Sequence, residues 1–547
     1  MENLSKSFSR RQFLKYLTAA TASVGAFALV GCQSNDTTGT DGTGGTGSTG
    51  SSQYADTLTY AQGADPRALD PAFFDDGESA KVACNIYEGL YRYDDKTTDV
   101  LPSLATALPD ISEDGLTYKI NLRQGVKFQD GTDFTADAVR VSWERQLSPN
   151  ATSDMPYASF VFGSPDIGSG LDSINIVDDY NIELTLRAPS SAFLRNLAMT
   201  LAAPICSPTA LNNNAGNISE APVGTGPYSF VSWTKSDNIK LLAYADYWDT
   251  ANAPKTKNVI FKVIPENATR VTALLNNEVD VIDGVDVSAA DQIINSGFTL
   301  FAEDGMTINY MAFNTSAGVC TDQDVRRALA QAVNVEELVT ALYGDYASPA
   351  TTVMPLWMAP YASGVTPVSF DPDTAKATLA AKGVTSLTCI TYTNPRPYNT
   401  KGGQVLAESI QGYLQNIGVT MTITPYDWTT YKTKVQTDPF DIAFYGWTGD
   451  NGDPDNFMNL LADPNPSMNI SRFNDPDYNA LIVKGLETPD GPDRDAVYLQ
   501  CEEMVAEKAP WLCISHAKNL CGVNPKVNDF YYHPTGSVFL RGVTKNA

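Results

Sequence analysis

Between residues 387 and 448 the spacing of the apolar residues alternates between the period of a strand and the period of a helix. The predicted elements are, in chain order, a strand at Leu387–Thr393, a helix at Thr400–Ile417, a strand at Val419–Thr424, a short helix at Trp428–Gln436 and a buried strand at Ile442–Tyr445. Gly418 ends the longer helix. This β-α-β-α-β order is typical of a parallel, doubly wound unit.

The amino-terminal half contains further patterned segments. They predict a strand at Tyr54–Gln62, a helix at Ala80–Leu90, a strand at Leu116–Arg123 and a helix at Thr135–Gln146 with Thr135 as its N-cap. Because 547 residues are too many for one ordinary hydrophobic core, we expect two or three domains.

Two charged residues follow strands of the unit 387–448: Arg396 lies in the loop after the first strand and Asp450 in the loop after the third. In doubly wound sheets, ligands bind beyond the carboxyl ends of the strands, where the strand order switches. If these two strands are neighbours they lie about 4.8 Å apart, and the two charges would face one crevice about 7 Å apart. A short free peptide is a zwitterion with charges at that separation. We therefore expect Asp450 to bind an α-ammonium group and Arg396 an α-carboxylate, although a lone Asp or Arg in a loop is more often a turn residue or a surface charge.

The charge balance excludes some partners. The formal net charge is −26, and residues 1–31 carry four basic residues against one acidic residue, so the rest of the chain carries −29. Binding to phosphates requires a basic surface, so we expect no nucleic acid partner. The chain has only two histidines, His516 and His533, and no HExxH pair, so we expect both to be structural and expect no metal and no cofactor.

The amino terminus resembles an export signal followed by a lipid attachment site. Arg10-Arg11 followed by Phe13-Leu14-Lys15 resembles the twin-arginine signal of bacteria. The apolar stretch Tyr16–Val30 is too short to remain as a membrane-spanning helix. It ends in Leu29-Val30-Gly31-Cys32, which resembles a lipoprotein cleavage box in which Cys32 becomes the lipidated first residue.

The segment Asn35–Ser52 is nearly all Gly, Thr and Ser and predicts a flexible tether with an r.m.s. reach of about 23 Å. The mature chain keeps seven cysteines besides Cys32. This odd number means that at least one of them is free or paired with another chain.

The segment Asp114–Arg145, DGLTYKINLRQGVKFQDGTDFTADAVRVSWER, resembles the signature segment of the extracellular solute-binding proteins that serve peptide ABC transporters, family 5. Pro222–Tyr228 and Asp324–Glu336 resemble the mid-lobe turn and the entry into the second lobe of that family, and the resemblance extends over nearly the whole mature chain. Arg396–Asn399 together with Gly446–Phe457 resembles the dipeptide-binding branch, although Thr400 stands where that branch tends to carry a second proline.

The resemblance implies an α/β, two-lobed periplasmic-binding-protein-like fold of class II, the large peptide-binding type, with an extra subdomain in lobe I. The implied division is a signal peptide at 1–31, a lipidated tether at 32–53, lobe I at 54–305 plus 526–547, and lobe II at 306–525. Two chain crossings would let the lobes close on a ligand. The resemblance also assigns Asp450 to the amino terminus of the ligand, Arg396 to its carboxyl terminus, and Trp447 and Tyr398 to the side-chain pocket. Core packing explains the two aromatic residues equally well.

Together these observations predict a monomeric substrate-binding lipoprotein of an ABC importer, anchored on the extracytoplasmic face of a bacterial membrane. It would capture di- or short peptides and deliver them to the membrane subunits of a permease. The alternatives are longer oligopeptides, haem or a metal complex. No G-x-S-x-G elbow occurs, so we expect no enzymatic activity. Gly452 and Pro454 break the order of a calcium loop around Asp453 and Asp455.

Overall fold

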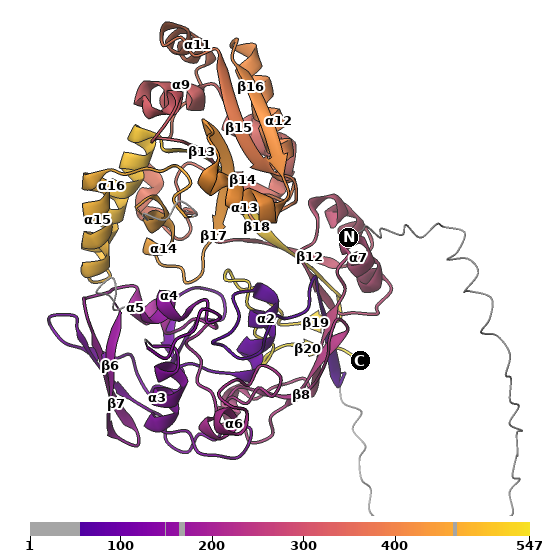
Figure 1. Cartoon of the computed structure of the whole chain (residues 1–547). Helices are drawn as coiled ribbons and strands as arrows, with labels where there is room; N and C mark the ends of the chain where they lie inside the picture. Colours follow the sequence, from indigo (N-terminus) through magenta and orange to yellow (C-terminus); the bar gives the residue numbers. More distant parts are fainter. Residues whose placement is uncertain (1–54, 148, 164–169, 463–467) are drawn as a thin grey trace, which may run out of the picture. The chain divides into compact units, whose positions relative to one another are not determined.

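The computed structural model describes residues 55–147, 149–163, 170–462 and 468–547, so the predicted signal peptide, Cys32 and the tether lie outside it. Its largest element is a twelve-stranded mixed sheet (Figure 1). The strands are, in chain order, β1 (Thr57–Gln62), β8 (Tyr228–Thr234), β9 (Asn238–Ala243), β10 (Asn258–Val263), β11 (Val281–Asp283), β12 (Thr299–Asp304), β13 (Thr307–Phe313), β14 (Ala347–Pro349), β15 (Ser386–Tyr392), β16 (Thr420–Tyr426), β17 (Ile442–Thr448) and β18 (Trp511–Val523). Their order is β16-β15-β17-β13-β18-β11-β1-β10-β9-β8, and β12 and β14 both pair with β18.

The predicted β-α-β-α-β unit is confirmed. Its helices are α12 (Gly403–Asn416), which runs along β15 and β16 in Figure 1, and α13 (Trp428–Thr437). β15 pairs in parallel with β16 on one side and with β17 on the other, where Cys389 lies opposite Ile442. The two strands that precede the predicted charges are therefore neighbours. The winding reverses between them, and this is the position at which doubly wound sheets bind ligands.

The helices of this unit begin and end for local reasons. Leu406, Ala407, Ile410 and Leu414 form the buried face of α12, whereas the apolar Val405 is 42% exposed. α13 begins at Trp428 because the side chain of Asp427 caps it and accepts a hydrogen bond from the amide of Thr430.

The amino-terminal elements required some corrections. The predicted helix at Ala80–Leu90 is α2 (Gly77–Ile86), which starts earlier because Asp76 caps it. Thr135 does precede α3 (Ala136–Glu144), but its side chain makes no capping hydrogen bond. A separate four-stranded sheet has the order β4-β5-β7-β6, with β4 at Asp110–Ile111, β5 at Thr117–Asn121, β6 at Leu171–Asp178 and β7 at Asn181–Leu186.

The hydrophobic cores divide along the chain. One large cluster contains only residues between Met306 and Ile514. A second, between Leu90 and Ile205, packs on the four-stranded sheet. Two further clusters combine residues 58–293 with residues 520–543. β18 contributes to the large cluster at one end and to the latter two at the other. The exact lobe boundaries stay a prediction.

Five further helices are α4 (Ala158–Phe162), α5 (Phe193–Asn196), α14 (Asp455–Met458), α15 (Pro476–Glu487) and α16 (Pro492–Lys508). In the described ranges no helix is at once long and apolar enough to cross a bilayer. All seven cysteines of these ranges are free.

Candidate ligand-binding site

Arg396 lies in a tight turn that follows β15. The amide of Arg396 donates to the carbonyl of Asn399 and the amide of Asn399 donates to the carbonyl of Arg396, both at 2.9 Å. The fully buried Asn399 side chain also accepts a hydrogen bond from the hydroxyl of Tyr343 at 2.8 Å and donates one to that of Tyr392 at 3.1 Å. Asn399 thus fixes the turn to the core, and the turn sets the position of the Arg396 backbone.

The guanidinium of Arg396 is stacked on an aromatic ring. Its Cζ lies 4.1 Å from the centroid of the Trp428 ring. Tyr445 is also nearby: burial raises the pKa of its hydroxyl to about 12, and the positive charge of Arg396 opposes this rise. In the part of the chain that the structure describes, no carboxylate forms an ion pair with Arg396. Its Nε atom is buried without a hydrogen-bond partner. The cation therefore lacks a counter-charge from the protein.

Tyr398 connects the two loops. Its ring is 5% exposed and lies against the backbone of Gly446 in β17, so closely that a Cβ at that glycine would overlap the ring. Burial raises the pKa of the Tyr398 hydroxyl well above its usual value, so the hydroxyl stays protonated. Tyr398 also packs edge-on against Tyr392 at 6.3 Å. The ring belongs to the core and at the same time holds the turn that carries Arg396 on β17.

Asp450 lies in the loop after β17, where Asn456 organises the backbone. The Oδ1 atom of Asn456 accepts hydrogen bonds from the amide of Asp450 at 2.9 Å and from Nε1 of Trp447 at 3.1 Å. Its Nδ2 atom donates to Oδ2 of Asp450 at 2.9 Å. The other carboxylate oxygen accepts from the hydroxyl of Tyr157 at 2.7 Å, so this group is held from two distant parts of the chain.

The Asp450 carboxylate has only neutral partners. Burial raises its pKa above the usual value, and the hydrogen bonds from Tyr157 and Asn456 oppose this shift only in part. No lysine, arginine or histidine of the described ranges forms an ion pair with it. An ammonium group bound beside this carboxylate would therefore supply the missing positive charge.

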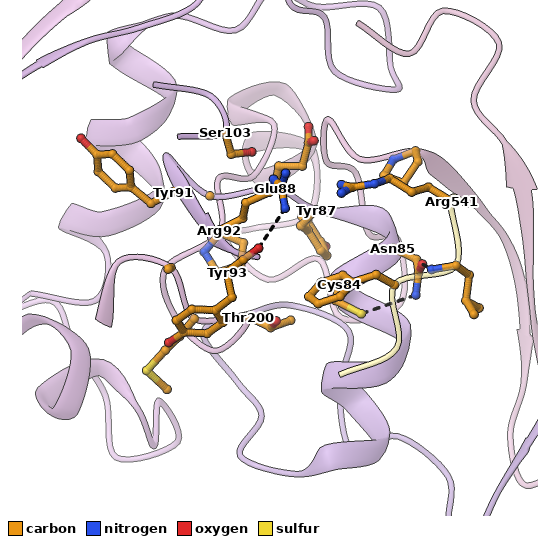
Figure 2. A pocket seen from close by; sticks show the side chains of 17 residues that line it. Cys84, Asn85, Tyr87, Glu88, Tyr91, Arg92, Tyr93, Ser103, Thr200 and Arg541 are labelled. Atoms are coloured by element: carbon orange, nitrogen blue, oxygen red, sulfur yellow. Dashed lines mark hydrogen bonds between the residues drawn. The ribbon is translucent and has the colours of Figure 1, made fainter. Parts of the chain in front are cut away.

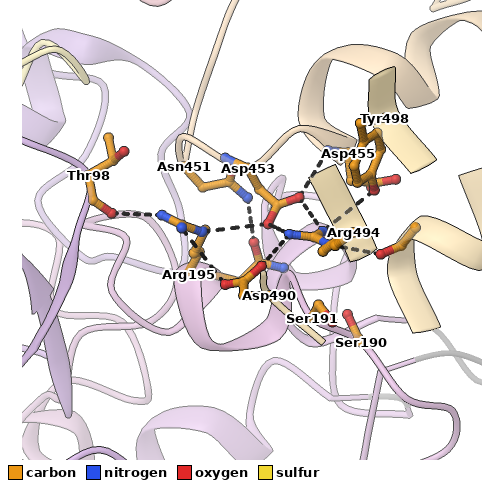
Figure 3. Close-up of polar contacts among 12 residues, drawn as sticks. Thr98, Ser190, Ser191, Arg195, Asn451, Asp453, Asp455, Asp490, Arg494 and Tyr498 are labelled. Atoms are coloured by element: carbon orange, nitrogen blue, oxygen red, sulfur yellow. Dashed lines mark hydrogen bonds and ion pairs between the residues drawn. The ribbon is translucent and has the colours of Figure 1, made fainter. Parts of the chain in front are cut away.

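The same loop continues into a charged network (Figure 3). Asp453 is fully buried and binds Arg494 of α16 through both oxygens, at 2.8 and 2.9 Å. Arg195 of α5 approaches from the other side: its Nε atom is 3.7 Å from Asp453, and its Nη2 atom is 3.8 Å from Asp490. Unlike Asp450, Asp453 is neutralised within the protein, so it serves structure.

Two further contacts accompany this network. Nδ2 of Asn451 donates to Oδ1 of Asn196 at 2.7 Å. The amide of Ser191 donates to the carbonyl of Leu486 at 2.9 Å, and its hydroxyl donates to the carbonyl of Thr488 at 2.5 Å. The segment from Tyr157 to Asn196 thus contacts the segment from Asp450 to Asp490 at several points.

The residues selected from the sequence are Asp450, Arg396, Trp447 and Tyr398. Arg396 and Tyr398 lie in the loop after β15, Trp447 lies near the end of β17, and Asp450 lies in the loop after β17. Sequence reasoning missed Tyr157, Asn456 and Trp428. Tyr157 is distant in the sequence and gave no signal. Asn456 lies six residues after Asp450, within the segment that resembles the dipeptide-binding branch, and Trp428 was assigned only to a helix.

A cavity elsewhere is not this site. Figure 2 shows a pocket around Glu88, lined also by Arg92 and Arg541, whose lining includes none of the four predicted residues. The Glu88 carboxylate accepts hydrogen bonds from Thr225, Tyr247 and Trp248 at 2.7–2.8 Å. The space that a water-sized sphere can occupy there is about 50 Å³, enough for a few waters and too little for a peptide.

His533 is fully buried and His516 is partly buried, and a ring nitrogen of each lies within hydrogen-bond distance of a backbone carbonyl. Nδ1 of His516 lies 2.6 Å from the carbonyl of Thr307, and burial lowers the pKa of His516 to about 4. Nε2 of His533 lies 2.8 Å from the carbonyl of Thr97. In the described ranges no group of three or more His, Cys, Asp or Glu side chains is arranged to hold a metal ion.

A parallel unit joined to a second body through continuous strands, with opposite charges after its neighbouring strands, defines the class of two-lobed solute-binding proteins. A sequence model of the bacterial extracellular solute-binding proteins, family 5, matches residues 99–469. The chain belongs to this family. Its members bind solutes rather than transform them, which confirms that the protein is not an enzyme.

Relatives align over most of their length. Heme-binding protein A of Haemophilus influenzae is 29% identical over 516 residues, which are 89% of this chain and 92% of that protein. The dipeptide-binding protein of Escherichia coli is 29% identical over 519 residues, 90% of this chain and 95% of that protein. The ABC transporter-associated periplasmic binding protein DppA of Helicobacter pylori, solved with the peptide STSA, is 29% identical with a TM-score of 0.74 and covers 90% of this chain and 99% of that chain. The predicted α/β, two-lobed fold is confirmed, with the four-stranded sheet and its core as the additional subdomain.

Proposed function

We propose that this protein captures di- or short peptides outside the cytoplasmic membrane and delivers them to the membrane subunits of an ABC permease. One observation carries the proposal: an unpaired guanidinium and an unpaired carboxylate follow two neighbouring parallel strands at the position where the winding reverses. A zwitterion of small size neutralises both. In this proposal Asp450 holds the ammonium group, Arg396 holds the carboxylate, and Trp447 and Tyr398 line the space for side chains.

Fixing both termini selects for length and leaves the side chains free. Removing one member of a buried, hydrogen-bonded ion pair typically costs about 3–5 kcal/mol, which is two or more decades in affinity. A longer peptide cannot place both of its terminal charges at once. Two of the aligned relatives are named as dipeptide-binding or peptide-bound proteins, which supports a peptide ligand. Haem is the second candidate, because a heme-binding protein aligns over a similar length.

The scarcity of histidine separates these candidates. Haem usually requires a His or Cys ligand. His533 is buried and His516 is partly buried, both have protein partners, and six of the seven cysteines of the described ranges are buried. A peptide therefore fits the side chains around Asp450 and Arg396 better than haem does.

The test is native mass spectrometry of the purified protein, followed by calorimetric titration with Ala-Ala, Ala-Leu and Ala-Phe. Each dipeptide is compared with its N-acetylated form and with its carboxyl-terminal amide. We expect stoichiometric binding of free dipeptides without turnover, and much weaker binding of both blocked forms. Equal binding of blocked and free forms, or co-purification of haem instead of peptide, would exclude the proposal.

The cellular location is part of the same proposal. We infer that Cys32 is lipidated after cleavage of a twin-arginine signal and that residues 35–52 act as the tether, with lobe I at 54–305 plus 526–547, lobe II at 306–525, and a monomeric state. Cys32→Ser should release the protein from the membrane fraction without changing its affinity for a dipeptide. A Cys32→Ser variant that remains in the membrane fraction would contradict the lipid anchor.

A further inference from the structure

Trp428 is placed to orient the ligand-binding arginine. Its ring carries the guanidinium of Arg396 on its face, with 4.1 Å between Cζ and the ring centroid. A guanidinium that lies over a ring has one face covered by that ring, so an anion binds to the N–H groups at its edge. The buried, unpartnered Nε atom of Arg396 belongs to that edge.

The ring itself is fixed on three sides. Tyr392 packs edge-on against it at 5.4 Å, and Tyr445 and Tyr431 pack against it at 5.3 and 6.0 Å. Trp428 is also the first residue of α13, whose start is held by two hydrogen bonds between Asp427 and Thr430. A ring with these neighbours has little freedom to rotate, so the plane that it presents to Arg396 is constant.

The other neighbours of Arg396 do not supply this constraint. The turn Arg396–Asn399 fixes the backbone, but the arginine side chain has four rotatable bonds beyond it. No carboxylate of the described ranges pairs with the guanidinium. The Tyr398 hydroxyl also approaches it, but this is a contact at a single point, whereas the Trp428 ring covers one face of the guanidinium.

We propose that Trp428 is a positioning residue of the peptide site: it holds the Arg396 guanidinium edge-on to the ligand, so that two parallel N–H groups bind the α-carboxylate. This inference rests on the proposed function, because it assigns Arg396 to the ligand carboxylate. In this proposal the protein discriminates between a free and a blocked carboxyl terminus partly through Trp428, which acts on Arg396 and does not itself touch the ligand.

The test compares Trp428→Leu, which removes the aromatic face, with Trp428→Phe, which keeps one. Each variant is titrated with Ala-Phe and with Ala-Phe amide. A desolvated cation–π contact corresponds to about a tenfold or larger change in affinity. We expect Trp428→Leu to lower the affinity for Ala-Phe by about tenfold and the affinity for Ala-Phe amide by less than twofold. Trp428→Phe should retain most of the wild-type preference for Ala-Phe over its amide.

Two controls separate positioning from a general structural effect. Trp233→Leu removes a tryptophan that also stacks on a cation, Lys235, but lies on β8 at the opposite edge of the sheet, so the affinity should not change. In an Arg396→Ala background, Trp428→Leu should change the affinity for Ala-Phe by less than twofold.

The outcomes are distinct. A wild-type protein that binds Ala-Phe and its amide equally overturns the proposed function and, with it, this inference. A wild-type protein that discriminates between them, together with a Trp428→Leu variant that weakens both ligands alike or neither, overturns the role of Trp428 alone. If Trp428→Leu fails to fold, Trp428→Met, which also lacks an aromatic face, takes its place: a positioning role predicts a lower ratio of the affinity for Ala-Phe to that for its amide at an unchanged melting temperature, and an unchanged ratio overturns the role.

Discussion

Asp450→Asn removes a single charge and preserves the shape of the site. The wild-type carboxylate accepts from Tyr157 and from Asn456, at 2.7 and 2.9 Å. In the variant the amide oxygen can accept from Asn456, while the amide nitrogen donates to the hydroxyl of Tyr157, which can act as an acceptor as well as a donor. Both hydrogen bonds survive, so the only large change is the loss of the negative charge.

The expected magnitude follows from burial. Because Asp450 has no cationic partner within the described protein, its desolvation is uncompensated until an ammonium group binds. Losing the charge should weaken a free dipeptide by about 3–5 kcal/mol, which corresponds to more than a hundredfold in Kd. The free energy of unfolding of the ligand-free variant should stay equal or rise, since an unpaired buried charge has been removed.

Isothermal titration with Ala-Phe and N-acetyl-Ala-Phe tests the first expectation, and urea unfolding without ligand tests the second. The wild type should prefer the free amino terminus strongly, whereas the variant should lose that preference. Asp450→Ala is the contrasting variant, because it leaves the Tyr157 hydroxyl and the Asn456 amide without this partner and should therefore also reduce stability. A variant Asp450→Asn that binds Ala-Phe as tightly as the wild type would remove Asp450 from the site.

Three other expectations concern the surrounding loop. Arg195→Gln removes one charge of the network in Figure 3 and should raise the dissociation rate of free and blocked dipeptides by the same factor, measured by stopped-flow fluorescence; a change confined to one of them would contradict this role. Gly446→Ala forces a Cβ into the Tyr398 ring and should cost about 1–3 kcal/mol of stability, whereas Gly412→Ala in α12 meets no atom within 4 Å and should not destabilise; equal melting temperatures would refute the overlap. Burial raises the pKa of Asp455 to about 7, so the folded state holds this proton more tightly than the unfolded chain does, and the resulting stability is present below about pH 4 and lost as the pH rises through 7. Asp455→Asn should therefore be more stable than the wild type by about 4 kcal/mol at pH 8, the free-energy equivalent of a pKa that rises from 3.8 to about 7, and nearly equal to it at pH 4, in urea unfolding; parallel stability profiles would refute this.

The unit 387–448 was predictable because each of its elements has a strong local signal. Apolar periodicity gave the strands and helices, Gly418 and Asp427 mark a stop and a start, and the chain order required parallel strands. The sequence left open whether the first and third strands are neighbours, and the structure shows that β15 and β17 pair in parallel. Arg396 and Asp450 were selected as candidates because ligands bind beyond the carboxyl ends of strands where the strand order switches, and both residues lie in such loops.

The remaining features depend on contacts between distant residues. Tyr157 approaches Asp450 across 293 positions of sequence, and no local pattern encodes such a contact. β18 is a single strand of 13 residues, yet it pairs with β11, β12, β13 and β14, so the sheet continues from one core to the next. The misplaced start of α2 has a different cause: Asp76 caps the helix six residues before Val82, its first strongly apolar residue.

The unpaired charges connect binding with closure. Asp450 receives one hydrogen bond from Asn456 in its own loop and one from Tyr157, so its polar environment is complete only when the segments that carry these residues are together. Without a ligand, the Asp450 carboxylate is removed from water among neutral partners, and the guanidinium of Arg396 has no counter-charge. Both conditions raise the free energy of the closed form relative to a form in which water solvates the charges. A ligand that carries both opposite charges removes both penalties, whereas a ligand blocked at one terminus removes only one. Since a ligand shifts a conformational equilibrium only by its difference in affinity for the two states, a free dipeptide should close the lobes more completely than a singly blocked one.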